Sequence, residues 1–173
     1  MSEKVKTSRP TEQGPFGTTH GNAVGKVWIT GDQIEITVDG LKVTAGLLEE
    51  EAPLTCIAFK SILPYEGTVV HLKWSGDGFQ THAPSLENIV PEHGLGMENF
   101  TLYGSRGDIL FWVRDRGLFF CYGYMHSKGN TGEEPGNLFA YVKPQDHPIL
   151  HEMGRRVFNE GRKPIKIRLL ECT

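Results

Sequence analysis

An apolar segment that opens with a proline, between two β-rich stretches, most constrains what this chain can fold into. Residues 49–67 read EEEAPLTCIAFKSILPYEG. Pro53 suits a first helical turn, because its missing N–H would have no partner there, and Glu49–Glu51 would place negative charge at the helix's positive end. The apolar residues that recur at helical spacing are Ala52, Cys56, Phe59 and Leu63. We predict a short amphipathic helix, ended by Pro64 and Gly67, whose apolar side packs on a sheet.

Alternating apolar residues on both sides of this segment predict β-strands. Residues 34–38 alternate and lead into Asp39–Gly40, a pair typical of a tight hairpin, and residues 41–45 form the return strand. Further strands are predicted at residues 68–74, 107–113, 118–124, 138–144 and 165–170. A second amphipathic helix is predicted at residues 147–160, with Gly161 as its left-handed stop.

This pattern predicts a mainly β protein: a closed β-barrel of about eight mostly antiparallel strands with two capping α-helices. Residues 1–25 are rich in Gly, Thr, Ser and Pro and are predicted to be a flexible N-terminal tail. Residues 26–173 are predicted to form the single barrel domain. Within it, residues 82–99 have weak periodicity and are interpreted as an excursion or lid.

Charge and cysteine content restrict the partners and the compartment. The net charge of −3 does not favour a nucleic-acid partner. The three cysteines, Cys56, Cys121 and Cys172, are odd in number and lack metal-type spacing, which indicates a reducing, cytoplasmic setting rather than a disulfide framework. No apolar run approaches the roughly 20 residues that span a bilayer, so no membrane partner is predicted.

Several short motifs resemble a known family. Ala52-Pro53-Leu54-Thr55, followed by Phe59, resembles the first barrel-capping helix of cyclophilins. From residue 63 onward the chain resembles a bacterial group of cyclophilin-like proteins known as domain of unknown function 3830. The pieces that carry this resemblance are LPYEG (63–67), HLKWSG (71–76), EN (98–99), GDILFW (107–112), GNLFA (136–140) and MGRRVFNEG (153–161). The resemblance covers about residues 45–170; it implies a cyclophilin-like barrel and no known activity.

One departure from true cyclophilins bears on activity. Their active-site strand carries Phe-His-Arg, whereas the matching place here reads Val70-His71-Leu72. Leu72 cannot donate a hydrogen bond to a substrate carbonyl. Peptidyl-prolyl isomerase activity is therefore the least favoured alternative.

Aromatic and polar residues near the predicted strand ends form the candidate ligand site. Trp74 would line a pocket at one end of the barrel. The alternative is that it only packs in the core, at an interface or on the surface. Every second residue from 122 to 126 is aromatic or histidine, so Tyr122, Tyr124 and His126 would share one side of a strand. This side could bind a planar or carboxylate ligand. The alternative is that it forms an aromatic ladder at a subunit interface. Lys128 and Asn137 would contribute from a Gly-rich loop that is otherwise a plain flexible connection. We predict no cofactor.

Metal and thiol sites are not predicted. His147 and His151 stand four apart on the second helix but have no evident third ligand. The potential ligands of the 82–99 segment would need that segment to fold back on itself; they are His82, Glu87, Glu92 and His93. Cys121 is interpreted as a buried, inert thiol.

The leading functional hypothesis is a protein that binds a small-molecule metabolite at one side of the barrel. The alternative is a non-catalytic module that forms a homo-oligomer through the aromatic surface and the N-terminal tail. The sequence identifies neither the ligand nor a reaction.

Overall fold

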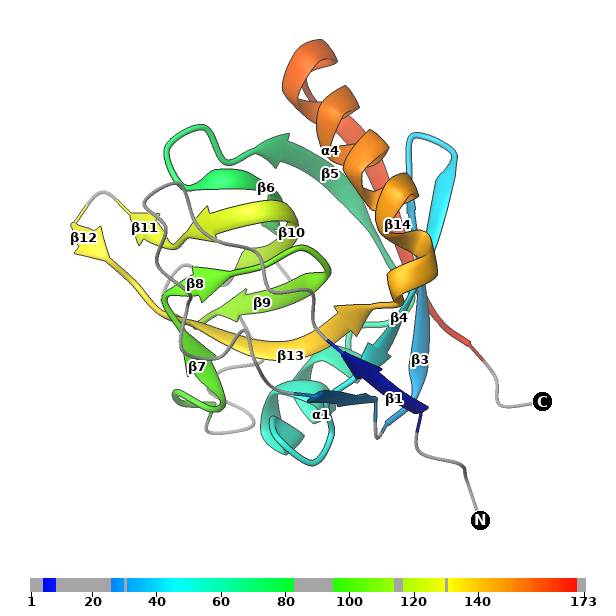
Figure 1. The fold of residues 1–173 in the computed structure, drawn as a ribbon, viewed down its shortest axis with the longest axis vertical. Coiled ribbons are helices and arrows are strands. Elements are labelled where there is room, and N and C mark those ends of the chain that lie inside the picture. Colours follow the sequence, from blue (N-terminus) through cyan, green and yellow to red (C-terminus); the bar gives the residue numbers. More distant parts are fainter. Residues whose placement is uncertain are drawn as a thin grey trace.

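The computed structural model describes residues 5–8, 26–29, 31–82, 95–113, 117–129 and 131–170. Eight antiparallel strands of this part form a closed barrel (Figure 1). They are β3 (Gln33–Val38), β4 (Leu41–Leu47), β5 (Tyr65–His71), β6 (Gly76–His82), β9 (Asp108–Trp112), β10 (Gly117–His126), β13 (Gly136–Val142) and β14 (Lys163–Leu170). Their order around the barrel is β4-β3-β14-β5-β6-β10-β9-β13, and β13 pairs with β4 to close it. The predicted mainly β, barrel architecture is confirmed.

Several short strands lie outside the eight-stranded barrel order. β7 (Phe100–Thr101) pairs with β13, and β8 (Tyr103–Gly104) pairs with the end of β10. β11 (Lys128–Gly129) and β12 (Gly132–Glu133) pair with each other. β1 (Val5–Ser8) pairs with β2 (Lys26–Ile29) in a separate two-stranded sheet. Most of the predicted 1–25 tail lies outside the described residues, so the domain boundary stays a prediction.

The barrel interior is filled by aliphatic and aromatic side chains from alternate strand positions. The rings of Phe79 and Phe120, which face each other across β6 and β10, stack with centroids 5.1 Å apart. Tyr65 and Thr81 share a buried hydrogen bond of 2.7 Å between their hydroxyl groups. The predicted Asp-Gly hairpin is confirmed, because Asp39 and Gly40 join β3 to β4 with positive φ angles of 51° and 79°.

Helix α1 (Pro53–Lys60) is the predicted proline-opened helix, and its apolar side packs into one end of the barrel. Thr55, Cys56, Ala58 and Phe59 are buried, and the Phe59 ring lies 4.9 Å from that of Phe139 on β13. The proline-opened helix and its packing on the barrel are therefore confirmed, but the helix ends at Lys60, so Leu63 and Pro64 lie beyond it.

The cap of α1 differs from the prediction. No acidic residue lies in its first turn, and Glu49 instead pairs with Lys60 at the last residue of the helix, at 2.5 Å. Glu98, distant in sequence, accepts hydrogen bonds from the backbone N–H of Leu54 (3.1 Å) and of Thr55 (2.8 Å). A carboxylate thus satisfies helix-end donors that have no partner within the helix.

Helix α4 (His147–Glu160) follows the short 3₁₀ turn η1 (Pro144–Asp146) and packs over the other end of the barrel. Its predicted bounds and its stop at Gly161 are confirmed. Arg156 of α4 pairs with Asp39 in the β3–β4 turn, with 3.2 Å between Nη1 and Oδ2. This turn lies at the start of β4, whereas α1 follows the end of β4. Figure 1 shows the two helices at opposite ends.

The strand predictions failed at three places. β5 ends at His71 rather than at Trp74, and β6 was not predicted because its sequence GDGFQTH holds two glycines. The predicted Gly-rich loop after residue 124 contains the β11–β12 pair. Of the 82–99 segment, residues 83–94 lie outside the described residues. No helix among the described residues is long and apolar enough to cross a membrane.

Replacing Glu98 with Ala should lower the free energy of unfolding by about 1–2 kcal/mol, because the first turn of α1 loses its carboxylate acceptor. Urea denaturation followed by circular dichroism measures this change. The matched control is Glu51→Ala, which removes an exposed acid just before the helix. Equal effects of the two substitutions would show that Glu98 does not cap α1.

Candidate functional site

Four of the six predicted site residues meet at the edge of the barrel where β10 ends. We call this surface the aromatic rim. Its residues are Trp74 from the β5–β6 turn, Tyr103 from β8, Tyr124 and His126 from β10, and Lys128 from β11. Tyr103 was not predicted as a site residue; only its position across from His126 in the β8–β10 register identifies it.

Backbone hydrogen bonds hold the elements of the rim together. The His126 N–H donates to the Ser75 carbonyl (2.8 Å), and the Ser75 hydroxyl donates to the Lys128 carbonyl (3.2 Å). The turn that carries Trp74 is therefore tied to the end of β10 and to the β11–β12 hairpin.

The side chains of the rim combine aromatic surface with one imidazole. The Tyr103 and His126 rings lie 4.7 Å apart, and His126 Nε2 lies 2.7 Å from Glu133 Oε1 on β12. Burial, and secondarily the neighbouring Tyr103, raises the pKa of Tyr124. Trp74 is 73% exposed. Its indole ring is thus available to a planar partner.

Trp74 is not on a strand, contrary to the prediction that it and His71 lie on opposite sides of one strand. The chain leaves β5 at His71 and turns over residues 73–75. His71 points inward, while Trp74 projects from the turn. The prediction that both belong to one β-strand failed because a tight turn replaces the last predicted residues of that strand.

Tyr122 is buried and contacts His71 and α4, whereas Tyr124 and His126 lie further along β10, beyond an irregularity in its pairing with β6 between Cys121 and Met125. Its hydroxyl shares a 2.8 Å hydrogen bond with His71 Nε2, and its ring packs edge-on to His151 of α4. Gly154 of α4 makes room for this ring, since a Cβ there would overlap it.

Burial keeps both members of this His71–Tyr122 pair neutral. Desolvation, assisted by Asp77, raises the pKa of Tyr122 to about 12, and desolvation lowers the pKa of His71. His71 Nδ1 is buried and has no hydrogen-bond partner among the described residues. The exposed Phe158 of α4 packs against the imidazole, with ring centroids 4.7 Å apart.

Asn137 lies away from the rim, at the end of the barrel closed by α1. It is fully buried, and its amide nitrogen donates to Thr55 Oγ1 (3.1 Å) and to the Gly96 carbonyl (2.9 Å). Its amide oxygen accepts from the Glu98 N–H (3.0 Å). This polar network therefore joins three of the motifs that suggested the family, and it fixes the start of α1 to the barrel. The motifs are APLT, EN and GN.

The two histidines of α4 have separate partners. His147 Nε2 is 3.1 Å from the Val142 carbonyl, and His151 contacts Tyr122. In the described part of the chain no group of three or more His, Cys, Asp or Glu side chains could hold a metal ion. Glu87, Glu92, His93 and the side chain of His82 lie outside that part.

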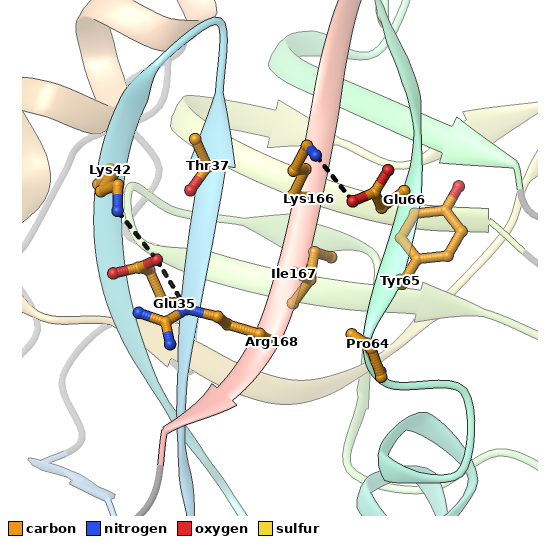
Figure 2. Close-up of a pocket in the computed structure, with 9 residues that line it drawn as sticks. All are labelled: Glu35, Thr37, Lys42, Pro64, Tyr65, Glu66, Lys166, Ile167 and Arg168. Atoms are coloured by element: carbon orange, nitrogen blue, oxygen red, sulfur yellow. Dashed lines mark hydrogen bonds and ion pairs between the residues drawn. The ribbon is translucent and has the colours of Figure 1, made fainter.

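A groove of about 290 Å³ lies elsewhere, on the outer surface of the strands around β14 (Figure 2). It is lined by Glu35, Thr37, Lys42, Pro64, Tyr65, Glu66, Lys166, Ile167 and Arg168. None of these was predicted as a site residue, because alternating charged residues on exposed strands have no distinctive sequence signal.

The family model described as "Protein of unknown function (DUF3830)" matches residues 34–169. The chain belongs to this family. The matched range contains both helices, the aromatic rim and all of the barrel except one residue at each end, so the predicted resemblance is confirmed. No curated protein matches this DUF3830 protein.

Solved structures share its fold. McbB in complex with tryptophan aligns with a TM-score of 0.63 at 22% identity over 81% of this chain, which spans 45% of the McbB chain. A hypothetical protein from Archaeoglobus fulgidus aligns with a TM-score of 0.53 at 14% identity, over 81% of this chain and 95% of its own. A cyclophilin-type peptidyl-prolyl cis-trans isomerase of Cryptosporidium parvum, solved with the dipeptide Ala-Pro, gives 0.50 at 13% identity, over 81% and 99%. At these identities the likeness shows the fold alone: the DUF3830 barrel is cyclophilin-like.

Replacing Tyr122 with Phe in this DUF3830 protein should destabilise it by about 1 kcal/mol, because His71 Nε2 would lose its hydrogen-bond partner. A double-mutant cycle with His71→Gln, read by urea denaturation, isolates the pairwise contribution. A coupling free energy of zero would mean that the two side chains do not interact.

Acidification should destabilise the protein partly through His71. Because burial lowers its pKa in the folded state, the unfolded chain takes up a proton first as the pH falls. Neutral His71 contributes fully to the free energy of unfolding above the imidazole pKa of the unfolded chain, about 6.5. This contribution is lost as the pH falls through that value toward the lower pKa of His71 in the folded state. Urea denaturation between about pH 7 and pH 5 should show a steeper loss for the native protein than for His71→Gln. Equal slopes would contradict the inference.

Proposed function

We propose that this DUF3830 protein binds a small aromatic metabolite at the aromatic rim. One observation carries the proposal: Trp74, 73% exposed, projects from a turn that is tied by hydrogen bonds to the strand end bearing Tyr124 and His126. A large exposed ring, on a turn bonded to a strand that carries further aromatic residues, offers stacking surface to a planar ligand.

Charged groups next to the rings would select among aromatic ligands. Lys128 and Glu133 face each other in the β11–β12 pair, and both are exposed. Lys128 would attract a ligand carboxylate. Glu133, whose Oε1 lies beside His126, would attract an ammonium group with its other oxygen. This pairing of opposite charges suits a zwitterion such as an aromatic amino acid. The tryptophan in the McbB complex supports L-tryptophan as the first probe.

Isothermal titration with L-tryptophan should detect binding, and both Trp74→Ala and Tyr124→Ala should weaken it by about tenfold or more, which corresponds to the loss of one stacking contact. Phe100→Ala is the matched control, because Phe100 is an exposed aromatic residue on β7, which pairs with β13, and it is not one of the rim residues. Unchanged affinity in both rim variants, or an equal loss in the control, would reject the proposal.

A second candidate function, a homo-oligomeric interaction module, is favoured by exposed apolar side chains near α1. Leu54 and Ile57 of α1 and Met97 and Phe100 beside it are each 45–65% exposed. Such patches commonly mark protein interfaces. If no aromatic probe binds and light scattering finds an oligomer that Ile57→Glu dissociates, this candidate replaces the first.

A further inference from the structure

The groove shown in Figure 2 is unrelated to the aromatic rim and shares no residue with it. It crosses four neighbouring strands, β4, β3, β14 and β5. Its volume of about 290 Å³ lies at the lower end of the range for small-molecule sites, about 300–1,000 Å³. A metabolite or fragment of a few tens of atoms at most would fit it.

The charges along the groove do not balance. Glu35 Oε1 accepts hydrogen bonds from both Lys42 Nζ (3.3 Å) and Arg168 Nε (3.0 Å), so two cations share one carboxylate oxygen. Lys166 pairs separately with Glu66 at 2.7 Å. Arg168, chiefly through its hydrogen bond, lowers the pKa of Glu35, which keeps that carboxyl ionised. Three cations against two anions leave the end at Lys42 and Arg168 with excess positive charge.

Hydrogen-bond donors remain unused at this end. The two terminal amino groups of Arg168 have no hydrogen-bond partner among the described residues, where only its Nε is bonded. The Thr37 hydroxyl, which stands in register between Lys42 and Lys166, likewise has no partner within the described ranges. A guanidinium with free terminal N–H groups binds carboxylate and phosphate oxygens well.

Apolar surface complements these donors. Pro64 is exposed at the β5 side of the groove, and the aliphatic stems of Lys42, Lys166 and Arg168 run along it. An anion with an apolar body would therefore find donors at the Arg168 end, and apolar surface along the stems and at Pro64.

We propose that this groove is a binding site for a small amphiphilic anion, a carboxylate or phosphate carried on a compact apolar group. Arg168 and Thr37 donate to the anionic oxygens, Lys42 supplies further positive charge, and the apolar group lies toward Pro64. The site does not depend on ligand binding at the rim.

Titration of ¹⁵N-labelled protein with benzoate, phenyl phosphate and benzylamine tests this site. The two anions should shift backbone amide signals of β3, β14 and β5 in a saturable way, whereas benzylamine, of similar shape but opposite charge, should not. Tighter binding of either anion supports the proposal and identifies the anionic group. Arg168→Gln should lower the affinity for both anions by about tenfold, the loss expected when a charge-assisted hydrogen bond is removed.

The matched control is Arg155→Gln on α4, which removes an equally exposed arginine that also pairs with a glutamate, Glu152. It should leave the affinity unchanged. The proposal is overturned if neither anion binds, if benzylamine binds as well as benzoate, or if the Arg168 and Arg155 variants behave alike. Shifts confined to the aromatic rim would also overturn it, without bearing on the function proposed for the rim.

Discussion

Closure of the barrel by β4 and β13 is the constraint on which the rest of the structure depends. Ala140, Tyr141 and Val142 pair with Leu47, Gly46 and Ala45, which joins the first barrel hairpin to the last third of the chain. Without this ladder both strands would be open edges with unpaired backbone groups. Closure also fixes which residues of β13 point inward, and so presents Phe139 to α1, where its carbonyl accepts from Cys56 Sγ at 3.5 Å.

The two ends of the closed barrel are sealed by different chemistry. At the α1 end, Thr55, Glu98 and Asn137 satisfy one another and the start of the helix, as stable buried polar groups must. This network is structural. At the α4 end, the His71–Tyr122 pair leaves one buried nitrogen without a partner among the described residues, and the neighbouring aromatic rim exposes a tryptophan. The exposed indole and the unpartnered imidazole nitrogen are the observations that lead us to place the proposed binding surface at this second end.

The sequence predicted correctly those elements that are determined by neighbouring residues. The proline-opened helix, the Asp39–Gly40 hairpin and the helix ending at Gly161 depend on neighbouring residues, and all three are confirmed. The cap of α1 was missed because Glu98 reaches it from a distant segment. Tyr122 was grouped with Tyr124 and His126 although its partners, His71 and His151, come from distant segments, and Asn137 was assigned to a loop although β13 begins at Gly136. These outcomes depend on register and on long-range contacts, which no local pattern carries.

The central claim is that the exposed indole of the rim is a ligand contact. Its most direct test is a two-dimensional ¹H–¹⁵N spectrum recorded during titration with L-tryptophan. Trp112 provides an internal reference, because its indole N–H is buried and donates to the Glu134 carbonyl at 3.1 Å. The account predicts that the indole signal of Trp74 moves saturably while that of Trp112 stays in place. A stationary Trp74 signal at saturating ligand would contradict it.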